Sequence, residues 1–365
     1  MPLTRLDITD FRNLAATKIE PLVAGFNLLY GLNGSGKTSL LEAIYYLSLG
    51  RSFRSGTIGR IIRNSADKML IFAHKQTSID QVVAVGVERP QFGSLKIRIA
   101  NKDAQSIAEI ANLLPVQLMN SSCYNLLDGG PVYRRKYLDW GNFYLHPHFF
   151  RVWQEYSLAL KQRNAALRNG LPRKELIIWN ESLASKAILL DQMRSDFIAL
   201  LFPLLKETLA ELIHLPDLEL SYLRGWEDGR NYEEVLESAF DKDRYLGYTQ
   251  NGPHRADFKM KLSGVDAKDI LSRGQQKLFV CAMILAQGAL LSRCTNKTPI
   301  YLIDDLPAEL DMLSRANLIA LLARQEAQIF VTAVEREALQ EILSRLPLKM
   351  FHVEHGNITE VMIGE

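Results

Sequence analysis

Eight residues near the N-terminus have the types and spacing that bind a polyphosphate. The segment GLNGSGKT matches the pattern G-x-x-x-x-G-K-[ST] at every fixed position. Its glycines allow successive backbone N–H groups to turn toward phosphate oxygens at a helix start. The Lys37 ammonium can reach the β- and γ-phosphates, and the Thr38 hydroxyl suits Mg²⁺. We therefore predict a nucleoside triphosphate site made by Gly31, Leu32, Asn33, Gly34, Ser35, Gly36, Lys37 and Thr38.

The segments on either side of this loop are those that such a site requires. A compact apolar strand is expected at Gly25–Tyr30, and apolar residues then recur at helical spacing from Leu40 until Gly50, a plausible helix stop. The alternative is a Gly-rich turn that binds nothing. Such a turn needs no strand before it and no amphipathic helix after it, so the context favours the phosphate site.

Two adjacent carboxylates follow a second apolar strand. Ile300–Ile303 is typical of a strand buried on both faces, and it runs directly into Asp304 and Asp305. Acids at the carboxyl end of such a strand lie where α/β sheets bind ligands. We expect Asp304 to hold the metal through its water shell and Asp305 to orient or deprotonate the attacking water. The alternative is a surface turn whose acids only cap the next helix.

A third motif opens the longest apolar helix of the C-terminal third. Its residues, LSRGQQK, resemble the L-S-G-G-Q signature of ABC-type ATPases, with Arg273 in place of one glycine. In that class, the serine and the helix N-terminus face a γ-phosphate held on a second subunit, and the chemistry is that of an anion at a positive helix end. Read alone, the segment is better explained as an ordinary Ser N-cap, but its place about thirty residues before the Asp304 strand favours the signature. The predicted signature residues are Ser272, Arg273, Gly274 and Gln275, and the following segment AELD resembles a D-loop with Glu309 and Asp311.

Three departures from the ABC pattern predict slow turnover. The chain reads Thr332-Ala333-Val334 where the switch histidine is usual, and Asn120 stands where a Q-loop glutamine is expected, with Gln117 close by. Asp305 occupies a position that is Glu in most such proteins.

Composition excludes several classes of protein. The 365 residues are 47% hydrophobic and 23% charged with a net charge of +2, so no global electrostatic attraction to nucleic acid or membrane is expected. The apolar stretch Leu278–Leu291 contains Gln287 and is shorter than the ~20 residues that span a bilayer. The first thirteen residues carry four charges, and the three cysteines form no C-x-x-C pair. We expect a soluble, cytoplasmic protein with no membrane partner, disulfide framework or zinc site.

The hydrophobic pattern predicts an α/β head interrupted by a helical insertion. Alternating β-branched runs between Lys68 and Ile99 indicate antiparallel strands, and helical spacing then prevails from about 132 to 215, broken near Gly170 and Pro172 into two helices that can fold back as a hairpin. The last third alternates helix and strand. The expected domains are 1–130 and 246–365 for the head, which has a mixed sheet, and 131–245 for the helical lobe.

With these pieces placed, nearly the whole chain resembles the RecF family of bacterial DNA repair and recombination ATPases. The segments that carry the resemblance are LTRLDITDFRNL, GLNGSGKTSLLEAIYYLSLGRSFRS, GGPVYRRKYLDWG, KQRNAALR, GPHRAD, LSRGQQKL and YLIDDLPAELD. The resemblance implies an SMC/Rad50-like ABC-type head with a second, helical lobe. It also implies ATP with Mg²⁺ as cofactors, an ATP-dependent homodimer, and work with RecO and RecR to load a recombinase at single-strand gaps.

Basic residues gather at three places where DNA phosphates can bind. Arg51, Arg54, Arg60 and Arg63 fall within thirteen residues that contain no acid; Arg134, Arg135 and Lys136 form a second cluster, and Lys161, Arg163 and Arg168 a third. The alternative for each is a solvated helix face or loop. His254 in GPHRAD lies near the nucleotide or is a turn histidine bonded to backbone.

The preferred interpretation is an ATP-gated DNA-binding protein that acts on gapped duplex and single strands. Two heads close head to tail, with each ATP between the phosphate loop of one subunit and the signature of the other. Slow hydrolysis then acts as a release switch rather than as metabolic catalysis. The rival is the ATPase subunit of a transporter, and a structural chromosome protein of SMC type is a third possibility that needs far longer arms.

Overall fold

The chain forms two compact units. The computed structural model describes residues 2–78, 81–215, 217–305 and 310–362. The first unit combines Met1–Cys123 with Leu291–Glu365, and the second unit comprises Tyr124–Leu290. The predicted head is therefore built from both ends of the chain.

A mixed sheet carries the strands that border the phosphate loop. Its order is β15-β14-β3-β13-β12-β8 in the described part of the first unit, with parallel pairing throughout except for β15 at the edge. Its strands are β3 (Gly25–Tyr30), β8 (Val116–Met119), β12 (Ile300–Ile303), β13 (Gln328–Ala333), β14 (Leu348–Glu354) and β15 (Asn357–Val361). All residues of β12 and β13 are buried, as expected for strands covered on both faces. The strand predicted at 300–303 is confirmed.

An antiparallel sheet forms the rest of the first unit's framework. Its described strands follow the order β2-β1-β4-β5-β6-β7. They are β1 (Leu3–Phe11), β2 (Leu14–Ile19), β4 (Lys68–Ser78), β5 (Gln81–Pro90), β6 (Lys96–Ile99) and β7 (Lys102–Asp103). The antiparallel strands predicted between residues 68 and 99 are confirmed.

Helix α1 (Lys37–Leu49) lies between these two sheets and is the centre of the core. It contacts β1 and β4 of the antiparallel sheet and β8, β12 and β13 of the mixed sheet. Ten of its thirteen residues are buried, so it is enclosed on almost all sides rather than exposed along one face. The first unit is completed by α2 (Ile107–Leu113), α11 (Met312–Ala323), α12 (Glu337–Leu343), the short helix η1 (Ile58–Arg60) and the start of η2 (Ser121–Leu126).

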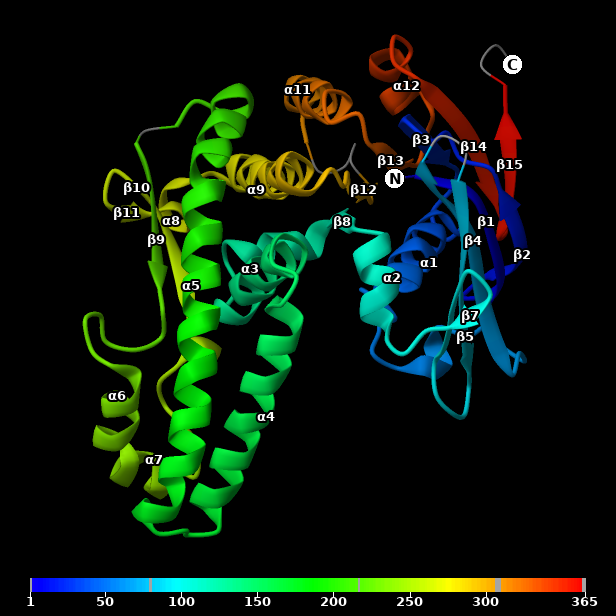
Figure 1. Cartoon of the computed structure of the whole chain (residues 1–365). Helices are drawn as coiled ribbons and strands as arrows, with labels where there is room; N and C mark the ends of the chain where they lie inside the picture. Colours follow the sequence, from blue (N-terminus) through cyan, green and yellow to red (C-terminus); the bar gives the residue numbers. More distant parts are fainter. Residues whose placement is uncertain (1, 79–80, 216, 306–309, 363–365) are drawn as a thin grey trace. The chain divides into compact units, whose positions relative to one another are not determined.

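Long helices dominate the second unit. Helices α4 (Phe149–Arg168) and α5 (Arg173–Leu212) pack side by side as the predicted hairpin, visible as the two long green ribbons of Figure 1. A small antiparallel sheet has the order β11-β10-β9. The remaining elements are α3 (Pro131–Leu145), β9 (Leu218–Leu223), α6 (Tyr232–Ser238), α7 (Phe240–Leu246), η3 (Pro253–Arg255), β10 (Asp257–Leu262), β11 (Val265–Asp266), α8 (Ala267–Ile270) and α9 (Arg273–Thr295).

The second unit extends further along the chain than the predicted helical lobe. The expected boundary lay at 245, whereas the unit continues to Leu290. Two pairings explain the difference. Strand β10 pairs along its whole length with β9, and the Tyr137 hydroxyl of α3 donates to the Met283 carbonyl of α9 at 2.8 Å. Residues 246–290 therefore pack with the insertion.

Candidate nucleotide site

The phosphate loop joins β3 to α1 in a conformation that requires glycine. Gly31 has φ +146°, and a Cβ there would lie 2.2 Å from the carbonyl oxygen of Val353. Its N–H donates to the Val334 carbonyl at 3.2 Å, which ties the loop to the end of β13. The helix that follows begins with the bond from the Leu40 N–H to the Gly36 carbonyl, so the first N–H groups of α1 lie at the loop, where an anion is favoured.

Lys37 is held by the loop itself. Its ammonium donates to the carbonyls of Gly31 at 2.6 Å and Leu32 at 3.0 Å, and only 8% of the residue is exposed. Burial lowers the pKa of Lys37, while the nearby carboxylates of Asp305 and Asp304 oppose that shift by favouring the charged form. The cation is thus placed between the loop and the acids after β12.

The register of the parallel sheet brings the first carboxylate to the phosphate loop. Ile303 pairs with Met119 on one side and Val331 on the other, so the residues after these three lie at one level of the sheet. Asp304 Oδ1 there accepts a hydrogen bond of 2.9 Å from the Thr38 hydroxyl. A hydroxyl oxygen beside a carboxylate is the kind of hard-oxygen pair that Mg²⁺ binds, so these residues fit the metal predicted for them.

Thr332 directly follows Val331 and so lies beside Asp304 in the sheet, although no role was predicted for it from the sequence. Its hydroxyl donates to Asp304 Oδ1 at 3.0 Å and accepts the backbone N–H of Asp305 at 2.7 Å. Asp305 itself is exposed and has φ +57°, in the left-handed region that few non-glycine residues adopt. The sequence signal for Thr332 was only its place at the end of a buried strand next to β12.

A second group of hydrogen bonds, which the sequence did not predict, holds the backbone of the phosphate loop in place. The Asn13 amide donates to the carbonyls of Ser35 at 3.1 Å and Gly34 at 3.3 Å, and it accepts the Ser39 hydroxyl at 2.8 Å. The Gly356 N–H donates to the Ser35 carbonyl at 2.8 Å. Asn13 lies in the β1–β2 turn and Gly356 in the β14–β15 turn, so two distant hairpins fix one loop.

These residues line a single cleft of about 1480 Å³ in the first unit. Its wall includes Arg12, whose guanidinium binds both oxygens of the fully buried Glu42 at 2.6 and 3.0 Å. The remaining charged side chains of the lining are Lys37, Arg54, Arg60, Arg63, Asp304 and Asp305. Cations outnumber acids there, which suits a polyphosphate. Asn120, at the expected Q-loop position, is also in the lining.

The predicted signature lies in the second unit, where it starts α9. The Ser272 N–H donates to the Gln275 side-chain oxygen at 2.9 Å, and the Gln275 N–H donates to the Ser272 hydroxyl at 3.3 Å. This is a reciprocal capping box, so the N-cap interpretation holds. Ser272, Arg273 and Gly274 are nevertheless exposed at the positive end of a 23-residue helix, a geometry that an anion can reach.

The predicted D-loop is described only in part. Asp311 caps α11 by accepting the Ser314 N–H at 2.9 Å and the Ser314 hydroxyl at 2.7 Å, and these bonds lower the pKa of Asp311. Glu309 lies outside the described residues.

The first basic cluster stays on the surface. Arg51, Arg54, Arg60 and Arg63 are exposed. Two of them have acidic neighbours that the local sequence did not show, since Arg54 lies 3.6 Å from Glu42 and Arg63 lies 3.9 Å from Asp10. About half of each of these two side chains is exposed, so both pairs are weak ones.

The structure corrects the second basic cluster. Arg134 binds Asp257 at 2.6 Å and the Gly129 carbonyl at 2.8 Å, with 13% of its side chain exposed. Arg135 donates to the Ala256 carbonyl at 2.8 Å. Both arginines hold α3 against β10 and its preceding loop, so they act inside the unit rather than as a basic surface.

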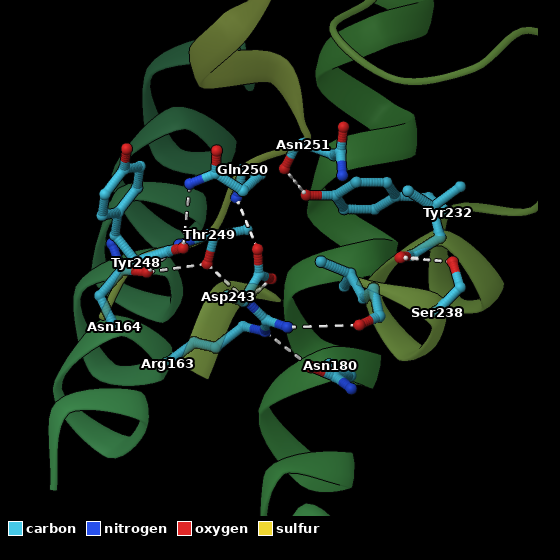
Figure 2. Close-up of polar contacts among 12 residues, drawn as sticks. Arg163, Asn164, Asn180, Tyr232, Ser238, Asp243, Tyr248, Thr249, Gln250 and Asn251 are labelled. Atoms are coloured by element: carbon cyan, nitrogen blue, oxygen red, sulfur yellow. Dashed lines mark hydrogen bonds and ion pairs between the residues drawn. The ribbon is translucent and has the colours of Figure 1, made fainter. Parts of the chain in front are cut away.

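In the third cluster the structure corrects Arg163, which is fully buried, whereas Lys161 and Arg168 are exposed. Its guanidinium binds Asp243 at 2.7 Å, Thr249 at 2.6 Å and Asn180 at 2.8 Å, as Figure 2 shows. A charge with three internal partners in a site closed to solvent cannot contact DNA. Its role is to join α4, α5, α7 and the loop that precedes η3.

His254 is a turn histidine in the second unit. Its Nε2 lies 3.0 Å from the Thr249 carbonyl and its Nδ1 lies 2.6 Å from the Tyr156 hydroxyl. Because a carbonyl only accepts, Nε2 carries the proton and Nδ1 accepts from Tyr156. Burial lowers the pKa of His254 to about 4. The backbone-bonded alternative is therefore correct.

Helix α9 is long and apolar enough to cross a membrane by length and composition alone, which the shorter stretch weighed in the sequence did not indicate. In the described residues, however, 72% of its most apolar window is buried inside the protein. That burial is typical of a core helix.

Comparison with known proteins defines the class and then the family. The RecF/RecN/SMC N-terminal domain model matches residues 2–359. An Smc head bound to the C-terminal winged-helix domain of ScpA superposes with a TM-score of 0.61 at 15% identity, over 100% of this chain and 98% of that one. The protein thus has the fold of an SMC/Rad50-like ABC-type ATPase head.

Closer relatives narrow the class. The chain is 40% identical to the DNA replication and repair protein RecF of Shewanella pealeana, over 99% of this chain and 100% of the relative. It is 43% identical to RecF of Pseudomonas aeruginosa, over 99% and 98%. A solved structure of the recombination mediator protein RecF-ATP in the RecFOR pathway matches with a TM-score of 0.89 at 25% identity, over 99% of this chain and 98% of that chain. The chain belongs to the RecF family.

Proposed function

We propose that this protein is an ATP-dependent DNA-binding protein of recombinational repair and replication. The observation that carries the proposal is the pairing of Thr38 with Asp304 in one cleft with Lys37, because P-loop NTPases hold Mg-nucleotide with this combination. The family supports the rest, since curated relatives are named DNA replication and repair proteins and a solved relative is named RecF-ATP.

The phosphate loop and the two carboxylates have separate roles in this proposal. Lys37 and the backbone N–H groups of Gly31–Thr38 bind the β- and γ-phosphates. Thr38 and Asp304 hold Mg²⁺, which when bound neutralises charge on the phosphate oxygens. The Thr38 hydroxyl donates its hydrogen bond to Asp304, so its oxygen keeps lone pairs for the metal. Asp305 orients the attacking water.

We infer that the signature acts in trans. Ser272–Gln275 are placed at an exposed helix start, where a phosphate of ATP bound to a second copy can be stabilised. Two copies then close head to tail around two nucleotides, and hydrolysis releases them. RecO and RecR are the partners that family membership suggests, and the cytoplasm is the expected location.

The proposed DNA surface is reduced to the first basic cluster. Arg51, Arg54, Arg60 and Arg63 are exposed, whereas Arg134 and Arg135 serve internal contacts. The last three of the cluster also line the nucleotide cleft, so ATP and DNA are recognised by adjacent surfaces of the first unit. Phosphate contact of this kind supports gapped, duplex and single-stranded DNA alike. The transporter subunit is disfavoured, because the relatives over the full length are DNA repair proteins.

The test is the molar mass in solution, measured by light scattering with a gapped DNA duplex, with and without Mg-ATP. We expect a monomer without nucleotide and a complex of two copies on DNA with Mg-ATP. Lys37→Ala is the matched control and should stay monomeric under both conditions. If wild type binds ATP but gives one copy per DNA with and without it, the dimer proposal is wrong. If ATP changes neither mass nor DNA affinity, the function itself is wrong.

A further inference from the structure

We propose that Thr332 is a positioning residue that sets the geometry of both carboxylates after β12. The inference rests on the proposed ATPase function and names a residue to which neither the sequence pattern nor the family comparison gives a role. Thr332 is the penultimate residue of β13 and is 0% exposed. Its side chain touches Asp304 and the backbone of Asp305 at 3.0 and 2.7 Å.

The direction of each hydrogen bond follows from chemistry. A backbone N–H only donates, so the Thr332 oxygen accepts from Asp305, and its single proton is then directed to Asp304 Oδ1. Asp304 Oδ1 also accepts a hydrogen bond of 2.9 Å from the Thr38 hydroxyl. Two hydroxyl groups, one from each neighbouring element, therefore converge on one carboxylate oxygen and restrict rotation of that carboxylate.

The bond to Asp305 has a separate consequence. A φ of +57° is unfavourable for a residue with a side chain, although Asp tolerates it better than most. A bond from its N–H to a buried hydroxyl holds the backbone in that state. Because the left-handed backbone decides where the Cβ points, Thr332 also decides where the Asp305 carboxylate points.

Thr332 lies in the segment where ABC-type proteins usually carry the switch histidine. In ABC-type proteins the switch histidine of this segment acts on the phosphate. Here the residue at the end of β13 acts on the acids, since β13 lies directly beside β12 in the sheet. Thr332 connects the metal-binding and water-orienting positions through one hydroxyl. Loss of such a supporting partner typically costs about 10- to 100-fold in metal affinity or activity.

The test compares Thr332→Val, which keeps the shape and removes the hydroxyl, with Thr332→Ser, which keeps the hydroxyl. Thr208→Val is the matched control, because that hydroxyl bonds the Leu204 carbonyl within helix α5, at 2.8 Å. Three quantities are measured: hydrogen exchange of the Asp305 amide without nucleotide, the Mg²⁺ concentration that half-saturates the gain in ATP affinity, and the rate of hydrolysis. ATP affinity in EDTA serves as the measure of an intact phosphate loop.

For Thr332→Val we expect exchange at Asp305 at least about 10-fold faster, a Mg²⁺ requirement about 10-fold higher, and hydrolysis about 10- to 100-fold slower, with ATP affinity in EDTA unchanged. Thr332→Ser and Thr208→Val should resemble wild type. If Thr332→Val does not fold, Thr332→Ala replaces it, since the smaller side chain cannot clash.

Two results overturn the proposal. One is that Thr332→Val or Thr332→Ala shows the same exchange at the Asp305 amide and the same Mg²⁺ dependence as wild type. The other is that Thr332→Ser, which keeps the hydroxyl, shows the defects expected of Thr332→Val. Failure of the proposed function looks different, because wild type itself would then bind no Mg-ATP. The exchange measurement needs no nucleotide and still decides the role of Thr332 in that case.

Discussion

The Thr38 hydroxyl donates a hydrogen bond of 2.9 Å to Asp304, although 266 positions separate the two residues along the chain. They meet because β3 and β12 both pair with β13, and the carboxyl ends of these parallel strands lie at one edge of the sheet. The whole second unit is inserted between them in sequence. The nucleotide site therefore forms only when the N-terminal and C-terminal segments of the chain pack together in the first unit.

Lys37→Ala should lower ATP affinity by about 10- to 100-fold, since a charge-assisted hydrogen bond is worth roughly 1.5–3 kcal/mol. The ammonium now bonds two loop carbonyls at 2.6 and 3.0 Å, so the variant also loses contacts within the loop. Calorimetric titration with ATP measures the loss. ATP affinity equal to that of wild type would show that this loop does not bind the triphosphate.

Asp305→Asn should still bind ATP but nearly stop hydrolysis, because the amide keeps the shape of the side chain and cannot act as a base. The ATP-bound dimer should then persist on DNA. Since Asp is one methylene shorter than Glu, wild-type hydrolysis should itself be slow, well below the ~10 s⁻¹ of a median enzyme. Size-exclusion chromatography with Mg-ATP and a phosphate-release assay measure both effects. A variant that turns over ATP like wild type would exclude Asp305 from water activation.

Asp304→Asn should have a different effect from Asp305→Asn. It weakens Mg²⁺ binding, because the carboxylate that receives the Thr38 and Thr332 hydroxyls loses its charge. ATP-induced dimer formation should need more Mg²⁺ by about 10-fold. A Mg²⁺ titration monitored by sizing chromatography distinguishes the two variants. Identical Mg²⁺ dependence in wild type and variant would remove Asp304 from the metal site.

Local patterns were enough to predict the elements that bear these residues. The strands at Gly25–Tyr30 and Ile300–Ile303 agree with the structure at both ends, and the helical hairpin breaks at Gly170 and Pro172 as expected. Each of these depends on neighbours within a few residues. Hydrophobic periodicity and turn residues predict structure over such short stretches of the chain.

Long-range contacts could not be predicted in the same way. Asn13 and Gly356 clamp the phosphate loop from hairpins at opposite ends of the chain, and nothing in either local segment indicates that contact. Arg163 was assigned to a basic surface because its partner Asp243 lies 80 residues away. A cluster of basic residues in the sequence does not show which acidic residues, distant along the chain, will pair with it in the folded protein.

Removal of two arginines from the first basic cluster, Arg51→Ala with Arg60→Ala, should weaken binding to all DNA sequences alike. The slope of the logarithm of the DNA-binding constant against log salt should fall in magnitude by about one to two. With fewer phosphate contacts, fewer counterions are released from DNA when the protein binds. Arg168→Ala is the matched single-charge control in the second unit, on a side chain that is exposed. Parallel salt slopes for wild type and the double variant would clear these arginines of phosphate contact.

Gly356→Ala should destabilise the first unit and lower ATP affinity. An added Cβ would lie 2.3 Å from the Asn13 carbonyl oxygen, and φ is +81°, so both contacts and backbone are strained. Gly264→Ala is the control, because its φ of +82° gives the same backbone strain with no atom within 4 Å of the added carbon. The difference in free energy of unfolding between the two, expected at about 1–3 kcal/mol, measures the clash. Equal destabilisation by both substitutions, with unchanged ATP affinity, would show that the β14–β15 turn does not support the loop.

The last prediction concerns acid. In the folded protein burial lowers the pKa of His254 from 6.5 to about 4, and the nearby cations Arg255, Arg135 and Arg163 add to that effect. Between these two values the unfolded chain binds more protons than the folded one, so stability falls as the pH drops from about 6.5 to 4 and is unaffected by this group above that range. A shift of this size corresponds to about 3 kcal/mol.

His254→Gln should remove this loss, because glutamine does not titrate. The free energy of unfolding of wild type and variant, measured by urea at several pH values, should therefore converge as the pH falls from 7 to 4. His214→Gln, at an exposed position of the second unit, should run parallel to wild type instead. His254→Gln is expected to be less stable than wild type at pH 7, because it disturbs the bonds of the His254 ring to Thr249 and Tyr156. A pH profile of His254→Gln that runs parallel to wild type would mean that His254 does not enter the folded protein in its neutral form.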